Sequence, residues 1–183
     1  METKYNMLSD LGLEPIIQAG GPTTMYSGTR PRTEVLEAMR EMAESFVLMD
    51  ELLLSAGEKI AEMLGVEAAT ITSGASGGLV LQAGAAISKG DSAIISKLPD
   101  TKGVPCELII QKCHRFSYDS LYLVPGSKLI EVGEKDSCTV EQIQDSINSQ
   151  TVGIIHLESP FKGEGCVNLN ELTSIAERNE LPI

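Results

Sequence analysis

Apolar residues recur at helical spacing in the first third of the chain. The first such run comprises Val35, Met39, Met42 and Phe46. It predicts a helix over residues 32–46, and a second run predicts a helix over residues 52–64 that ends at Gly65. The stretch before residue 28 shows no clear period. We therefore expect residues 1–66 to form an N-terminal arm followed by helices.

Beyond residue 67, short apolar runs alternate with segments of helical rhythm. The predicted strands cover residues 68–72, 93–95, 108–111, 129–132 and 152–157. The predicted helices cover residues 77–87 and 117–123, and two more begin after Thr139 and Asn168, each with a capping-box pattern. Such alternation indicates an α/β fold, here a three-layer sandwich whose mostly parallel sheet carries helices on both faces. We expect this domain to occupy residues 67–183.

The stretch TITSGASGGL, residues 70–79, lies where a predicted strand gives way to a helix. A helix that starts there offers unpaired N–H groups and the positive end of its dipole to an anion. The small residues Ser73, Gly74, Ala75 and Ser76 let a ligand approach the backbone closely. The stretch has neither the lysine of a P-loop nor the GxGxxG spacing of a dinucleotide-binding turn. Two interpretations stay open: a phosphate cradle, or a tight turn whose small residues serve packing alone.

Charge and composition exclude several classes of function. The 183 residues carry 26 acidic and 14 basic side chains, a net charge of −12, which argues against general binding of nucleic acid. The N-terminus has no apolar core of a signal peptide, and no run of eighteen apolar residues suggests a membrane span. Four cysteines without CxxC spacing and two histidines suggest no zinc set. We expect a cytoplasmic protein with free thiols.

Four longer stretches together resemble one enzyme family, in the family's order. They are GGPTTMYSGTRPRTEVLEAM, FVLMDELLLSAGEKIAEMLGVEAATITSGASGGLVLQAGAAIS, QKCHRFSYDSLYLVPGSKLIEVG and GIIHLESPFKGEGCVNLNELTSIAERNELPI. In these the chain resembles the N-terminal half of fold-type-I pyridoxal-phosphate enzymes, whose fold is aminotransferase-like and close to class V. The group in question contains selenocysteine synthase (SelA-like enzymes) and D-glucosaminate-6-phosphate ammonia-lyase. The resemblance implies pyridoxal 5′-phosphate as cofactor and residues 67–183 as a partial large domain.

The resemblance also assigns roles to individual residues. It implies that the turn Ser73, Gly74, Ala75 and Ser76 binds the cofactor phosphate. It implies that His114 stacks on the pyridine ring, whereas a lone histidine bonded to backbone is the other interpretation. Pro160 occupies the place of an asparagine that contacts the ring oxygen in many relatives. Because proline cannot donate a hydrogen bond, the neighbouring Ser159 is the candidate cofactor-binding residue at this place. Arg30 is a candidate contact for an anionic substrate. His156, inside an apolar run, is interpreted as a core histidine whose polar atoms are satisfied.

Two reactive residues of the family have no counterpart in this sequence. The aspartate that pairs with the pyridine nitrogen and the lysine that forms the Schiff base are both expected beyond Ile183, as is the small C-terminal domain. The sequence thus predicts a fragment with no catalytic residue of its own and no turnover. The parent activity is expected to be an ammonia-lyase-like elimination on an amino acid or amino sugar acid. L-seryl-tRNA(Sec) selenium transfer and a non-catalytic dimerisation module are the alternatives, and the complete enzyme is expected to be a homodimer or higher oligomer.

Overall fold

The computed structural model describes residues 7–159 and 165–183, and the chain divides into two compact units, Met1–Ala69 and Thr70–Ile183. The elements of the first unit are α1 (Met7–Asp10), η1 (Thr24–Tyr26), α2 (Thr33–Ala43) and α3 (Met49–Leu64). Both predicted helices are present. α2 ends three residues before the predicted end, and α3 begins three residues before the predicted start. α3 stops at Gly65, whose φ of +66° is the left-handed conformation that glycine adopts at helix ends.

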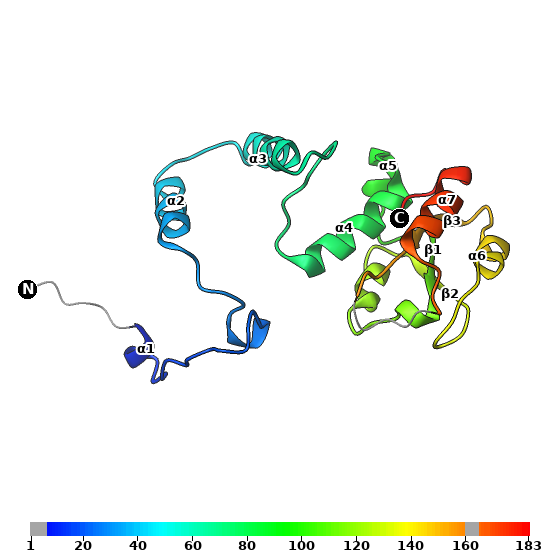
Figure 1. The fold of residues 1–183 in the computed structure, drawn as a ribbon. Helices are drawn as coiled ribbons and strands as arrows, with labels where there is room; N and C mark the ends of the chain where they lie inside the picture. The colour runs from blue at the N-terminus through cyan, green and yellow to red at the C-terminus, as the bar shows by residue number, and fades with distance from the viewer. Residues whose placement is uncertain (1–6, 160–164) are drawn as a thin grey trace, which may run out of the picture. The chain divides into compact units, whose positions relative to one another are not determined.

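The second unit contains the sheet, and its elements are visible in Figure 1. They are α4 (Ala75–Ser88), α5 (Ser92–Ile95), β1 (Glu107–Gln111), η2 (Lys112–His114), η3 (Asp119–Leu123), β2 (Lys128–Val132), α6 (Val140–Ser146), β3 (Thr151–Ile155) and α7 (Leu169–Arg178). The three strands are parallel in the order β2-β1-β3. In this register Ile109 lies between Ile130 and Ile154. The predicted α/β class and parallel sheet are confirmed.

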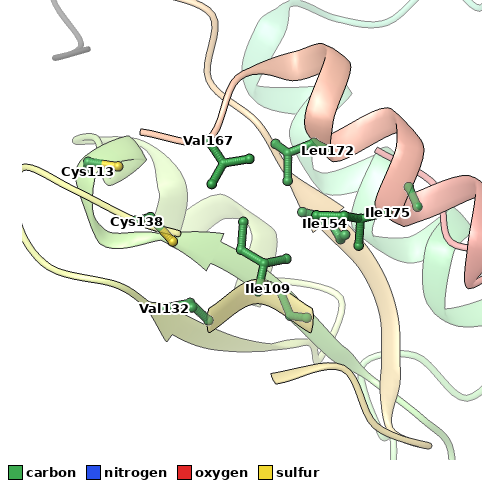
Figure 2. Packing of buried hydrophobic residues seen from close by; sticks show 10 residues of the cluster. Ile109, Cys113, Val132, Cys138, Ile154, Val167, Leu172 and Ile175 are labelled. Atoms are coloured by element: carbon green, nitrogen blue, oxygen red, sulfur yellow. The ribbon is translucent and has the colours of Figure 1, made fainter. Parts of the chain in front are cut away.

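Helices pack on both faces of this sheet and create two separate clusters of buried residues. One face places Ile109 and Ile154 against Leu172 and Ile175 of α7, as Figure 2 shows, with Ile143 of α6 in the same cluster. The other face of the sheet packs against α4. Its cluster contains Ala83 and Ile87 of α4 together with Leu108, Ile110, Val152 and Ile155 of the strands. Successive residues of β1 point to opposite faces, so a continuous apolar run is what a sheet covered on both sides requires.

Two of the five predicted strands are wrong. Residues 93–95 lie in α5, because the side chain of Asp91 accepts hydrogen bonds from the N–H groups of Ala93 (2.7 Å) and Ile94 (3.4 Å) and so caps a helix. Residues 68–72 form no ladder with any strand of the described chain, and an extended segment without a partner is not a β-strand. The helix after them, α4, is present and is half-buried along much of its length.

The capping boxes are confirmed at both predicted positions. Thr139 and Gln142 bond each other's backbone N–H groups at the start of α6, and Asn168 and Glu171 do so at the start of α7. The last residues, 181–183, are irregular. The carbonyl of Pro182 nevertheless accepts a hydrogen bond from the N–H of Ile154 at 3.0 Å, so they lie beside β3.

The expectation of four free thiols is wrong. Cys113 and Cys166 form a disulfide with their Cα atoms 6.3 Å apart, because the fold brings together two positions 53 residues apart in sequence. Cys106 and Cys138 are free and buried. Within residues 7–159 and 165–183, no helix combines the length and the apolar character that crossing a bilayer requires.

Candidate functional site

The predicted anion-binding turn is at the start of α4, as expected. Gly74 is the N-cap residue, with a φ of +136° that side-chain-bearing residues rarely adopt. The hydroxyl of Thr72 donates to the carbonyl of Gly74 at 2.9 Å and so folds the turn. A Cβ atom on Gly77 would lie 2.7 Å from the hydroxyl oxygen of Ser73. Glycine at both positions therefore lets the chain turn tightly into the helix.

The N-terminus of α4 differs from those of α6 and α7 in how its N–H groups are satisfied. Among the described residues no side chain caps it, as is also the case for α2 and α3, whereas capping boxes close α6 and α7. Ser73, Gly74, Ala75 and Ser76 are all exposed. A fourteen-residue helix with an uncapped, exposed first turn can receive an anion on its N–H groups. The residues present thus fit a phosphate group.

His114 lies in η2, directly after β1, and is 2% exposed. Its Nδ1 atom accepts a hydrogen bond from the N–H of Leu157 and lies near Nε2 of Gln111, both at 3.4 Å. Its ring meets the ring of His156 edge to face, with centroids 4.6 Å apart. The structure thus places His114 inside the unit, bonded to backbone and in contact with a second imidazole.

His156 follows β3 and is only partly the core histidine that the sequence suggested. Its side chain is 8% exposed, and Nε2 lies 3.1 Å from a carboxylate oxygen of Glu158. Its Nδ1 atom is buried and has no hydrogen-bond partner among the residues that the structure describes. The prediction of a buried ring is confirmed, and of the two nitrogens only Nε2 has a partner among the described residues.

Arg115 organises the segment after His114. It bonds the carboxylates of Asp119 and Glu131, and Asp119, 4% exposed, also accepts from the N–H of Phe116 at 3.1 Å. The hydrogen bond to Asp119 raises the pKa of the Arg115 guanidinium above its ordinary value, against the effect of burial. This ion-pair network was not predicted. Its only signal in the sequence is the four-residue spacing of Arg115 and Asp119.

Ser159, Pro160 and Arg30 are the remaining residues to which the resemblance assigned roles or places. Ser159 is partly buried, four residues beyond the end of β3. Pro160 lies outside the described residues. Arg30 is exposed and belongs to the first unit. Their assigned roles stay predictions.

A cavity of about 640 Å³ runs along β3 within the second unit. Ile154, Ile155 and Pro182 give it apolar walls, and His156 and Glu158 add polar groups. A largely apolar hollow with a few polar groups is typical of small-molecule sites. Sequence patterns gave no indication of this cavity, because it is formed between α4, β3 and the last residues of the chain.

The fold and the turn together define a class: α/β proteins with a parallel sheet covered on both faces and a helix whose N-terminus is uncapped and exposed. Comparison with known proteins is more specific. The chain is 30% identical to the D-glucosaminate-6-phosphate ammonia lyase of Salmonella typhimurium (strain 14028s / SGSC 2262), over 97% of this chain and 50% of that enzyme. A solved structure of D-glucosaminate-6-phosphate ammonia-lyase superposes with a TM-score of 0.90 at 29% identity, over 98% of this chain and 50% of that one.

A second curated relative carries a different name. The chain is 27% identical to the 5′-C-glycyluridine monooxygenase-decarboxylase of a Streptomyces species, over 94% of this chain and 45% of that enzyme. No protein-family model matches the chain. The chain spans about half the length of the curated relatives it matches. The predicted resemblance to the D-glucosaminate-6-phosphate ammonia-lyase group is confirmed.

Proposed function

We propose that this chain supplies the phosphate-binding part of a pyridoxal-phosphate-dependent lyase that eliminates ammonia from an amino sugar acid or amino acid. The observation that carries the proposal is the uncapped, exposed N-terminus of α4 in a chain that matches an ammonia lyase in sequence and in structure. In such enzymes the cofactor, when bound, withdraws electrons from the substrate's amino-bearing carbon.

In the proposal the turn before α4 holds the cofactor phosphate. The N–H groups of Ala75 and Ser76 donate to its oxygens, and the hydroxyls of Ser73 and Ser76 can add two further donors. A dianion at this place compensates the first-turn N–H groups, which no side chain caps. The positive end of the α4 dipole favours the same charge.

His114 is the proposed neighbour of the cofactor ring. It follows the carboxyl end of β1, and ligands of parallel α/β sheets commonly bind at that edge. The ring is 2% exposed, so the proposal also requires that the segment covering it shifts when the ligand binds. Ser159, beyond the carboxyl end of β3, is the proposed contact for the ring oxygen, and Arg30 the proposed contact for an anionic substrate.

The domain arrangement, the oligomeric state and the reaction are parts of the same proposal. Residues 67–183 form part of the large domain, after an N-terminal arm and helices in residues 1–66, and the assembled enzyme is a homodimer or higher oligomer. Ammonia elimination is preferred to seryl-tRNA selenium transfer, because neither matched relative bears the latter name and the net charge of −12 disfavours a polyanionic substrate.

The proposal is tested by measuring the affinity of the full chain for pyridoxine 5′-phosphate and for pyridoxine. Neither compound has an aldehyde, so neither labels lysines covalently, and the difference between them isolates the phosphate. We expect the phosphate ester to bind at least tenfold more tightly, since charge-assisted hydrogen bonds contribute about 1.5–3 kcal/mol each. Inorganic phosphate should compete with it.

Ser76→Ala provides the site-specific arm of this test, with Ser92→Ala as matched control. Ser92 is an exposed serine in the first turn of another helix, α5. We expect Ser76→Ala to weaken binding of pyridoxine 5′-phosphate about tenfold and Ser92→Ala to leave it unchanged. Equal affinity for the ester and for pyridoxine would overturn the proposal.

A further inference from the structure

The end of β1 is fastened at three places to the segment that precedes α7. The side chain of Gln111, 0% exposed, accepts from the N–H of Val167 at 2.8 Å and donates to its carbonyl at 3.0 Å. The disulfide between Cys113 and Cys166 is the third connection, and its Cα separation of 6.3 Å lies in the usual range. Two hydrogen bonds and one covalent bond thus hold the same two segments together.

Backbone contacts fix Cys166 on both of its sides. The carbonyl of Gly165 accepts from the N–H of Cys138 at 2.8 Å, and Val167 is held by Gln111. Neither contact involves a sulfur atom. When the bond is reduced, these contacts keep the two thiols close to each other, so their effective concentration stays high and the bond re-forms readily.

We propose that Cys113 and Cys166 form a reversible redox site, a dithiol that low-molecular-weight disulfides such as glutathione disulfide convert to the bond described here. The thiolate of Cys166 attacks one sulfur of glutathione disulfide, forms a mixed disulfide and releases one glutathione thiolate. The thiolate of Cys113 then attacks the Cys166 sulfur and releases the second. Two protein thiols lose two protons and two electrons, and one glutathione disulfide becomes two glutathiones.

Exposure selects Cys166 as the thiol that reacts first with a dissolved disulfide, and Cys113 is its partner because it lies next to Cys166 in the fold. Cys166 is partly exposed, whereas Cys113, Cys106 and Cys138 are 7%, 4% and 7% exposed. Burial raises the pKa of the Cys138 thiol, which lowers its thiolate fraction and its reactivity. Cys138 belongs to the same buried cluster as Cys113, as Figure 2 shows. It is therefore the natural internal control.

The bond bears directly on His114, which follows Cys113 within η2. A covalent link at Cys113 restricts the backbone from which the imidazole projects and favours its contact with His156. An effect of this restriction on the cofactor depends on the proposed function. The redox change itself does not, because it can be measured in the chain without any ligand.

The same group of side chains offers one competing chemistry. Ligand atoms of Cys113, His114 and Cys166 lie within 4.8 Å of one another, and zinc favours thiolate and imidazole ligands. A zinc site requires both sulfurs as thiolates. The pairing of the two sulfurs with each other in this structure favours the redox site.

The experiment equilibrates the full chain in glutathione buffers of increasing disulfide content, then maps each cysteine by differential alkylation and mass spectrometry. We expect Cys113 and Cys166 to change state together, while Cys106 and Cys138 stay thiols. Gln111→Met should require an approximately tenfold higher ratio of disulfide to squared thiol for half-oxidation, because the clamp no longer sets the effective concentration. Cys138→Ser should leave the midpoint unchanged.

A second readout follows the two histidines by NMR. The chain contains only two, so their ring signals are resolved and His156→Gln assigns them. We expect the His114 signal to differ between the two redox states of the wild type and not to respond to glutathione in Cys166→Ser. Should that variant fail to fold, the wild-type titration alone still decides.

Three results would overturn the proposal. One is that no bond forms between Cys113 and Cys166 under oxidising conditions, whether both stay thiols or Cys113 pairs with Cys138 instead. Another is a bond that no excess of reduced glutathione opens, which would make it purely structural. The third is stoichiometric zinc binding by the reduced chain that protects Cys113 and Cys166 from oxidation. Failure of pyridoxine 5′-phosphate to bind would contradict the proposed function and leave the redox site unaffected.

Discussion

Replacing Gln111 by methionine keeps the length of a buried side chain and removes its ability to donate and accept hydrogen bonds. The wild-type amide makes two hydrogen bonds to Val167, at 2.8 and 3.0 Å, and both residues are nearly inaccessible, at 0% and 4% exposed. The backbone N–H and C=O of Val167 would therefore lose their partners without gaining water.

The expected destabilisation follows from these two groups. A buried polar group left unpaired costs about 1–3 kcal/mol, and two are created here. The thioether is less costly to bury than the amide and offsets about 1 kcal/mol of this sum. We expect a net loss of about 1–5 kcal/mol in the free energy of unfolding of the second unit.

The assay is urea-induced unfolding followed by circular dichroism, with excess dithiothreitol so that the disulfide does not contribute. Hydrogen exchange of the β1 and β3 amides reports the second unit by itself. Gln144→Met is the matched control, since Gln144 is exposed on α6, and it should change stability by less than about 0.5 kcal/mol. If Gln111→Met were no more destabilising than this control, the two hydrogen bonds would not contribute as argued.

Two further predictions concern backbone geometry and pH. Gly126→Ala should lower the free energy of unfolding by more than about 2 kcal/mol, because φ is +96° and the new Cβ would lie 2.2 Å from the Pro99 carbonyl oxygen. Gly103 has a φ of +78° and open space around it, so Gly103→Ala should lower the free energy of unfolding by only about 1–2 kcal/mol in the same urea titration. Burial and the charge of a neighbouring carboxylate raise the pKa of Tyr122, so the unfolded chain ionises first and stability should fall as pH rises above about 10. Tyr122→Phe should flatten that slope whereas Tyr118→Phe, at an exposed position, should not, and an unchanged slope in Tyr122→Phe would refute the assignment.

Local signals in the sequence predicted local structure well. The capping boxes at Thr139 and Asn168 need only residues three apart, and the stop of α3 needs only Gly65. The continuous apolar runs of β1 and β3 identified strands buried on both faces. The three apolar residues at 93–95 are too few to show a helical or a strand period. The N-cap residue Asp91 stabilises a helix there, where a strand was predicted.

The candidate site was predictable only in part, because most of its contacts join distant positions. The turn before α4 is a local feature, and its place at a helix start is confirmed. His114 follows β1 and His156 follows β3, so their contact joins residues at the ends of two different strands. The disulfide joins residues 53 apart, so that no spacing rule reveals it. Chain topology, and not residue type, creates these pairs.

The short segment after α7 lies along the outer edge of β3, where Pro182 can accept a hydrogen bond but cannot donate one. A Cβ atom on Gly153 would lie 3.3 Å from the Pro182 carbonyl oxygen, so the absence of a side chain there lets the segment approach the strand. Pro182 accepts from Ile154, but it has no N–H to donate in return. The proline therefore limits this segment to accepting hydrogen bonds at position 182, while Gly153 lets it lie close along β3.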